Sequence, residues 1–84
     1  MENKILVIVY VPLLEDEYSI FIPVNKKIGT IRNNIIQTIT ELSEGGLKIS
    51  DQMGLYDSEK ATVYDNNVYV NDSGITNGTK LILM

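Results

Sequence analysis

The feature that most constrains the fold is an uninterrupted apolar run near the start of the chain, residues 5–11. It reads Ile-Leu-Val-Ile-Val-Tyr-Val and is dominated by β-branched residues, which favour strands. A strand without polar alternation is typical of one that is buried on both faces or that faces a partner. We therefore predict that this run is the central strand of a small sheet.

Composition argues against most catalytic and metal-binding functions. The chain has 84 residues, enough for one domain over residues 1–84 with a single core layer. It has no Cys and no His, so it lacks a thiol nucleophile, the commonest general base and the commonest transition-metal ligand. We expect no enzymatic activity, no catalytic residue, no cofactor and no metal site.

The charge pattern disfavours nucleic acid and anionic membranes as partners, because the net charge is −4 and the Lys and Arg residues are scattered. Lys4 precedes an apolar stretch, as in a signal peptide, but Pro12 interrupts it and three acidic residues follow. No run approaches the ~18 apolar residues that a membrane span needs. We expect a soluble, cytoplasmic protein that does not insert into a membrane.

Further strands are indicated by shorter apolar runs. Residues 18–23 predict a second strand, joined to the first by an acidic corner over residues 13–17. Residues 53–56 predict a short strand. Asn77-Gly78 is a strong turn signal, and residues 79–84 after it predict the last strand.

Between the second strand and the short strand, the apolar period changes to that of an amphipathic helix. The stripe consists of Ile28, Ile31, Ile35, Ile39 and Leu42. Asn25 and Thr30 are candidate N-caps, and Gly45-Gly46 is expected to end the helix because glycine readily adopts the left-handed conformation of a C-cap. Ile36 lies off the stripe and is expected near the edge of the sheet.

This order of elements is that of an α+β fold of the β-grasp type. It has a mixed sheet of four to five strands with one helix packed on one face. The last strand would lie parallel to the first, and the helix supplies the crossover that a parallel pair requires. The alternative, a ferredoxin-like domain, needs a second helix, and residues 43–78 show no second helical stripe.

One helix can cover only one face of the sheet, so an apolar set is expected on the other face. If Val7, Val9 and Val11 point toward the helix, alternate residues point away from it. We call the apolar residues expected on this side of the sheet, from the first strand and the other strands together, the open face: Leu6, Ile8, Tyr10, Phe21, Tyr56 and Ile82. Together they would form a patch of several hundred Å², a size typical of interaction sites. In the opposite register the two sets exchange roles.

Other candidate motifs are better explained as turns. Glu15, Asp16 and Glu17 could attract a divalent cation, but they are too few for a six-to-eight-oxygen site. Two matches to the N-glycosylation pattern, at residues 71–73 and 77–79, also read as turns. The remaining aspartates are too dispersed for an EF-hand loop and are predicted to form turns: Asp51, Asp57 and Asp65.

The closing segment, residues 70–83, resembles that of ubiquitin-like domains, with an apolar residue, a turn, Ile75, a second turn and a strand in order. More narrowly, residues 73–83 together with residues 7–12 are similar to the YukD/EsaB family. These are small bacterial ubiquitin-like proteins associated with WXG100, or type VII, secretion systems. The resemblance implies a β-grasp fold and protein partners that bind through the sheet face.

The chain departs from conjugated ubiquitin-like proteins in one respect. The resemblance implies that modifiers and sulfur carriers need a flexible tail ending in Gly-Gly, whereas this sequence stops at Met84 within the last predicted strand. Gly45-Gly46 is internal and is explained by the helix end. We therefore expect neither conjugation nor sulfur transfer.

Two functions remain open. The first is an adaptor that docks onto a larger machine, such as a secretion component, through the open face. The second is a structural homo-oligomer, such as a homodimer, in which the same face is buried between copies.

Overall fold

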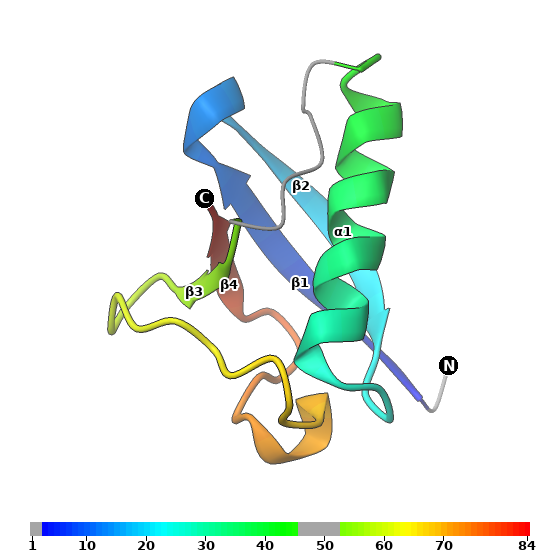
Figure 1. Cartoon of the computed structure of the whole chain (residues 1–84), viewed down its shortest axis with the longest axis vertical. Coiled ribbons are helices and arrows are strands. Elements are labelled where there is room, and N and C mark those ends of the chain that lie inside the picture. Colours follow the sequence, from blue (N-terminus) through cyan, green and yellow to red (C-terminus); the bar gives the residue numbers. More distant parts are fainter. Residues whose placement is uncertain (1–2, 46–52) are drawn as a thin grey trace.

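A computed structural model describes residues 3–45 and 53–84 of the chain. The elements follow in the order β1 Lys4–Val11, η1 Pro12–Leu14, β2 Asp16–Pro23, α1 Ile28–Leu42, β3 Leu55–Asp57, η2 Val70–Asp72 and β4 Lys80–Leu83, where η marks a short 3₁₀ helix. The four strands form one sheet in the order β2-β1-β4-β3, and α1 packs on one side of it (Figure 1). The predicted β-grasp fold, with a mixed sheet and one helix, is confirmed.

The strand β1 is an interior strand of the sheet, as its unbroken apolar run predicts. It pairs with β2 in antiparallel orientation, with Leu6 opposite Phe21, and with β4 in parallel orientation, with Val9 opposite Leu81. The strand β3 then adds to β4 in antiparallel orientation. The helix α1 lies in the long connection between β1 and β4, which is the crossover that a parallel pair requires.

The core lies between the sheet and α1. Val7, Val9 and Val11 are all completely buried, so the predicted register of β1 is confirmed. Burial of each such side chain stabilises the fold by roughly 1.5–3 kcal/mol. The buried apolar residues are Val7, Val9, Val11, Ile22, Ile28, Ile31, Ile35, Ile36, Ile39, Leu55, Val70, Ile75, Leu81 and Leu83.

The helix buries most of its predicted stripe, with one exception. Ile28, Ile31, Ile35 and Ile39 are buried, but Leu42 is 60% exposed, so its assignment to the core was wrong. Leu42 is the last residue of α1, and Figure 1 shows this end of the helix diverging from the strands. Ile36, expected at the edge of the sheet, is 1% exposed and belongs to the core.

Backbone carbonyls from a distant segment cap the start of α1. The N-cap is Lys27, which makes no side-chain cap, so the predicted caps Asn25 and Thr30 were wrong. Instead, the Ile28 N–H donates to the Val68 carbonyl at 2.8 Å and the Gly29 N–H donates to the Asn66 carbonyl at 3.0 Å. These bonds satisfy two of the N–H groups that the first turn leaves free.

The end of α1 is a Schellman motif in which the first left-handed residue is a glutamate. Glu44 has φ 57°, and the Gly45 N–H donates to the Thr40 carbonyl at 2.8 Å. Gly45, with φ 82°, continues the turn, while Gly46 lies outside the described residues. The predicted position of the helix end is confirmed, but the first left-handed position falls on Glu44 instead of a glycine.

The Asn77-Gly78 turn joins the last strand to the first. The Asn77 side-chain oxygen accepts a hydrogen bond from the Leu6 N–H at 2.8 Å, and the Gly78 N–H donates to the Leu6 carbonyl at 2.7 Å. Gly78 has φ 90°, a conformation that favours glycine. The parallel pairing of β4 with β1 begins directly after this turn.

Other differences concern the ends of elements. The strand β2 begins at Asp16, earlier than predicted, β3 is shifted to Leu55–Asp57, and β4 covers Lys80–Leu83. Arg32, on α1, donates from Nη1 to the Met53 carbonyl at 2.7 Å and so links the helix to the segment before β3. No helix within residues 3–45 and 53–84 is long and apolar enough to cross a bilayer.

Replacing Asn77 should show how much its side chain contributes to closing the sheet. We expect Asn77→Ala to lower the free energy of unfolding by about 1 kcal/mol, because the Leu6 N–H loses its acceptor. Asn77→Asp keeps an acceptor at the same position and should retain most of the stability. Urea denaturation of both variants measures this, and equal losses would contradict the role given to the hydrogen bond.

Glu44→Gly should stabilise the protein. The substitution removes the strain of a left-handed non-glycine residue, so we expect the free energy of unfolding to rise by roughly 0.5–1 kcal/mol. Glu41→Gly, one turn earlier within α1, is the matched control and should instead lower it by about 1 kcal/mol. Denaturation midpoints that shift in the same direction for both variants would contradict this prediction.

Candidate functional site

The strand register brings the six predicted residues of the open face onto one side of the sheet. Residues paired between neighbouring strands point to the same side. Tyr10 is paired with Ile82, and Ile82 is paired with Tyr56, so one row crosses β1, β4 and β3. Four residues before Tyr10 on β1, Leu6 is paired with Phe21, which extends the set onto β2. These residues come from all four strands.

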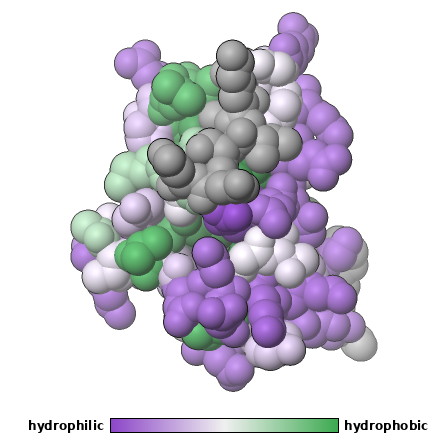
Figure 2. All heavy atoms as spheres, in the orientation of Figure 1, coloured by the Kyte–Doolittle hydropathy of each residue, from purple (hydrophilic) through white to green (hydrophobic). Residues whose placement is uncertain are grey.

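The residues of the open face are exposed to different degrees. Phe21 is 57% exposed and Tyr10 is 41% exposed, whereas the other four are partly buried. The helix lies on the opposite side of the sheet, where Val7 and Val9 are fully buried. Figure 2 shows many hydrophilic residues on the side of the molecule where α1 lies. Tyr10 and Phe21 are the large apolar side chains on the described strands that are classed as exposed.

Two further apolar residues extend the open face and were missed in the sequence. Met84 continues the pairing of β4 with β3, since it exchanges backbone hydrogen bonds with Gly54 at 2.8 and 3.2 Å. It lies two residues after Ile82, so its side chain points to the same face, and it is 53% exposed. The alternation of side chains along the predicted strand could therefore have identified it. Val63 is 60% exposed and forms a bridge with Tyr56 across a turn, which no local pattern indicates.

Polar residues divide the apolar surface. Ile8 is paired with Ser19 on β2 and with Lys80 on β4, and Tyr10 is paired with Glu17. Lys80 and Glu17 are exposed. A partner of the open face would therefore need an acceptor or a carboxylate near Lys80 in addition to apolar side chains.

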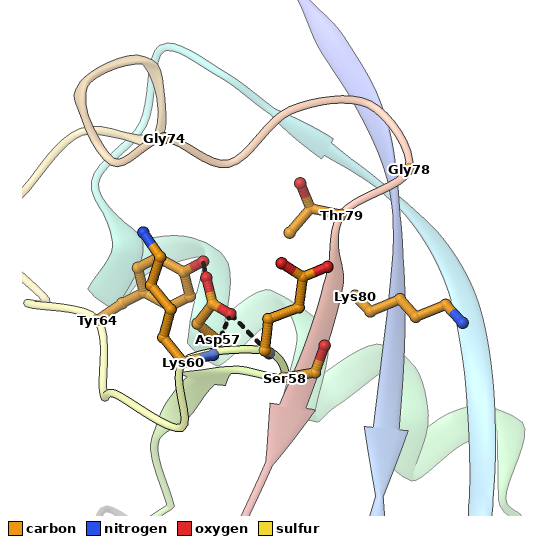
Figure 3. Close-up of a pocket in the computed structure, with 9 residues that line it drawn as sticks. Asp57, Ser58, Lys60, Tyr64, Gly74, Gly78, Thr79 and Lys80 are labelled. Carbon is orange, nitrogen blue, oxygen red and sulfur yellow. Dashed lines mark hydrogen bonds between the residues drawn. The ribbon is translucent and has the colours of Figure 1, made fainter.

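A polar pocket lies beside the sheet, between the loop after β3 and the turns before β4. It has a volume of about 360 Å³, and Asp57 is its central carboxylate (Figure 3). Asp57 Oδ1 accepts hydrogen bonds from the Glu59 N–H at 2.8 Å and the Lys60 N–H at 3.0 Å. Its Oδ2 accepts one from the Tyr64 hydroxyl at 3.1 Å. The carboxylate is thus used to close its own loop.

The environment shifts the pKa values of both partners in this contact. Hydrogen bonds from the backbone at Lys60 and Glu59 hold the pKa of Asp57 below its usual 3.8. Burial, together with the hydrogen bond to Asp57, raises the pKa of Tyr64 to about 12. At neutral pH the pair is an ionised carboxylate bound to a neutral phenol, which is a structural arrangement.

Of the acidic residues weighed as cation ligands, Glu15 lies in the turn after η1, whereas Asp16 and Glu17 are the first two residues of β2, so the predicted turn reaches only to Glu15. Glu15 is the left-handed residue that ends η1, and Asp16 Oδ1 accepts a hydrogen bond from the Glu17 N–H at 2.9 Å. Asp65 Oδ1 accepts one from the Asn67 N–H at 2.8 Å. Asp51 lies outside the described residues. Within the described part of the chain, no group of three His, Cys, Asp or Glu side chains could hold a metal ion.

No family model and no curated protein matches the chain. Solved structures do match it, among them the EccD5 ubiquitin-like domain from Mycobacterium xenopi, with a TM-score of 0.78 and 14% identity over 98% of this chain and 93% of that one. The ubiquitin-like domain of the Mycobacterium tuberculosis type VII secretion system protein EccD1 has a TM-score of 0.73 and 12% identity, over 96% and 97%. A chain from a toluene 4-monooxygenase complex has a TM-score of 0.75 and 6% identity, over 96% of each chain.

At such identities the similarity establishes the fold. The chain has the ubiquitin-like β-grasp fold. The similar structures include ubiquitin-like domains of type VII secretion proteins, which is the group that the resemblance of the closing segment indicated. The monooxygenase match shows that the same fold also occurs in an enzyme complex, so the function has to be argued from the surface of this chain.

Asp57 should make stability depend on pH in acid. Because its folded-state pKa is lowered, its contribution is complete above pH 3.8 and is lost as the pH falls through the lower folded-state value. We expect Asp57→Asn to be less stable than the wild type at pH 7, with the difference shrinking below about pH 4. Urea denaturation between pH 7 and pH 2 measures this difference. A difference that does not change with pH would contradict the ionic role.

Proposed function

We propose that the chain is a non-enzymatic, non-conjugated ubiquitin-like module that binds a protein partner through its open face. In this proposal it acts in the bacterial cytoplasm as an accessory or adaptor of a type VII secretion system. The observation that carries the proposal is the uncovered apolar side of the sheet, where Tyr10 and Phe21 are 41% and 57% exposed. Exposed apolar patches of this kind usually mark interaction sites.

The chemistry of the side chains supports a binding role over a catalytic one. The sequence has no His and no Cys. Within the described part of the chain, the two ionisable groups with shifted pKa values, Asp57 and Tyr64, bind each other and the loop that carries them. A general base would need a free partner atom within reach of a substrate, and this carboxylate is already occupied by three donors.

The open face has the composition expected of a binding site. Its central row contains two tyrosines, Tyr10 and Tyr56, on either side of Ile82. Aromatic residues are enriched among the side chains that contribute most to protein–protein affinity. Lys80 and Glu17, which interrupt the apolar surface, would select a partner by charge and would disfavour partners of the wrong polarity.

The assignment to secretion rests on two similarities. The closing segment with Ile75, Asn77 and Gly78 resembles that of the YukD/EsaB family, and the fold is that of the ubiquitin-like domains of EccD1 and EccD5. The former group is associated with WXG100 secretion, and EccD1 is a type VII secretion protein. Partners are therefore expected among the components of such a machine, and a homodimer through the open face is the competing arrangement.

A pull-down from the native cells with tagged protein tests this proposal. We expect wild type to recover secretion components, identified by mass spectrometry, and Ile8→Lys to lose them, because a charge in the middle of the open face must be desolvated on binding. Tyr10→Lys is a second variant at a more exposed position, where a lysine disturbs the packing of the fold less. Gln37→Lys, on the exposed side of α1, is the matched control and should bind like wild type.

If both open-face variants recover the same components as wild type, the docking surface is wrong. If wild type recovers only itself and Ile8→Lys abolishes this recovery, the competing homo-oligomer is favoured.

A further inference from the structure

The outer edge of β2 is a second surface that is free to bind. Among the described strands, β2 pairs only with β1. The hydrogen bonds of β1 show which way the backbone N–H and C=O groups of β2 point. On the side of β1 that faces β4, the Ile8 N–H donates to the Thr79 carbonyl at 3.0 Å. The backbone N–H and C=O groups of even-numbered β1 residues therefore point toward β4, and those of odd-numbered β1 residues point toward β2. By register, the N–H and C=O groups of Ser19 and Phe21 on β2 point away from the sheet.

This free edge is short, and both of its ends are closed. At one end, the Glu17 N–H donates to Asp16 Oδ1 at 2.9 Å. At the other end, Pro23 has no N–H to donate. The segment between them carries Ser19 and Phe21, which are both exposed. The edge can therefore accept another short strand centred on Ile20.

The charges at the two ends of β2 are opposite. Acidic residues lie at its beginning, at Glu15, Asp16 and Glu17, and basic residues follow its end, at Lys26 and Lys27. All five are exposed. A strand with this arrangement complements a second copy of itself in antiparallel orientation, because each acidic end then meets a basic end. In parallel orientation, like charges would meet.

We propose that two copies of the chain pair through the β2 edge, in antiparallel orientation, about a two-fold axis at Ile20. Ser19 of one copy then exchanges both backbone hydrogen bonds with Phe21 of the other, and the axis repeats this exchange. Phe21 is 57% exposed, and the small side chain of Ser19 leaves room for it across the junction. The acidic start of each strand lies near Lys26 of the other copy.

This pairing is distinct from the docking described above. It uses the backbone edge of the sheet, so it does not rest on the proposed function. Phe21 is shared with the open face, whereas Tyr10, Tyr56 and Ile82 stay uncovered. Lys27 is a poorer choice than Lys26 for testing the charges, since its Nζ lies 5.8 Å from the centre of the Tyr69 ring. Glu15 lies in the turn before β2 and outside the open face.

Sedimentation equilibrium of the purified full chain, from about 10 µM to about 1 mM, tests the proposal. We expect a reversible dimer that weakens at high salt, because the opposed charges are screened. Ser19→Pro, which removes an outward N–H where an edge strand tolerates proline, should abolish dimerisation. Circular dichroism checks that this variant remains folded.

Charge variants test the orientation without altering the backbone. Glu15→Lys alone and Lys26→Glu alone should each weaken the dimer by about tenfold, because the two-fold axis makes each substitution disrupt two charge contacts in the dimer. The double variant, with both changes in one chain, should regain an affinity within about threefold of wild type. Tyr10→Lys, on the open face, should dimerise like wild type.

Three outcomes would overturn the proposal. The first is a wild-type chain that is monomeric throughout the concentration range. The second is a dimer that both single charge variants leave unchanged. The third is a dimer that Tyr10→Lys abolishes, which would place the contact on the open face instead.

Discussion

The structure depends on the pairing of its first strand with its last. The side chain of Asn77 and the backbone of Leu6 are joined over a sequence separation of 71 residues, so this contact closes almost the whole chain into a loop. Loop closure costs conformational entropy that grows with the length enclosed. The cost is offset by the core under β1, where Val7, Val9 and Val11 lose all their exposure. Once β1 and β4 are paired, the helix has only one side of the sheet on which to pack.

The proposed function is argued from this asymmetry between the two sides of the sheet. Alternation along β1 gives its odd-numbered residues to the core and leaves Leu6, Ile8 and Tyr10 for the other side. A polar sequence at these positions would have made an ordinary solvated sheet. Their apolar character has no role in the core, and it is explained most simply by a partner that covers them.

Features with a local physical cause were predictable from the sequence. The alternation of the strands predicted two sets of side chains on opposite sides of the sheet, one of which is the open face, and the helical period predicted most of the buried stripe. Met84 could also have been found, since it lies two residues after Ile82 and therefore on the same face of the strand. These features depend on periods of two and about 3.6 residues, which are set by backbone geometry.

Features decided by tertiary contacts were not predictable. The start of α1 is capped by the carbonyls of Asn66 and Val68, which lie far along the chain, so no nearby side chain was needed as a cap. Leu42 continues the helical stripe but lies where α1 has diverged from the sheet. Val63 reaches the open face only because a turn brings it against Tyr56. In each case the deciding neighbour is distant in sequence.

The two binding surfaces, the open face and the β2 edge, would reinforce each other. In antiparallel pairing, Ser19 of one copy and Phe21 of the other lie on the same side of the joined sheet, so the two open faces form one continuous surface. A partner with two binding segments, or two copies of a partner in a symmetric machine, could then engage both faces at once. The second engagement would be intramolecular, and even a weak interaction at each face could give tight binding. Low affinity of the isolated monomer would therefore be consistent with firm attachment to a symmetric assembly.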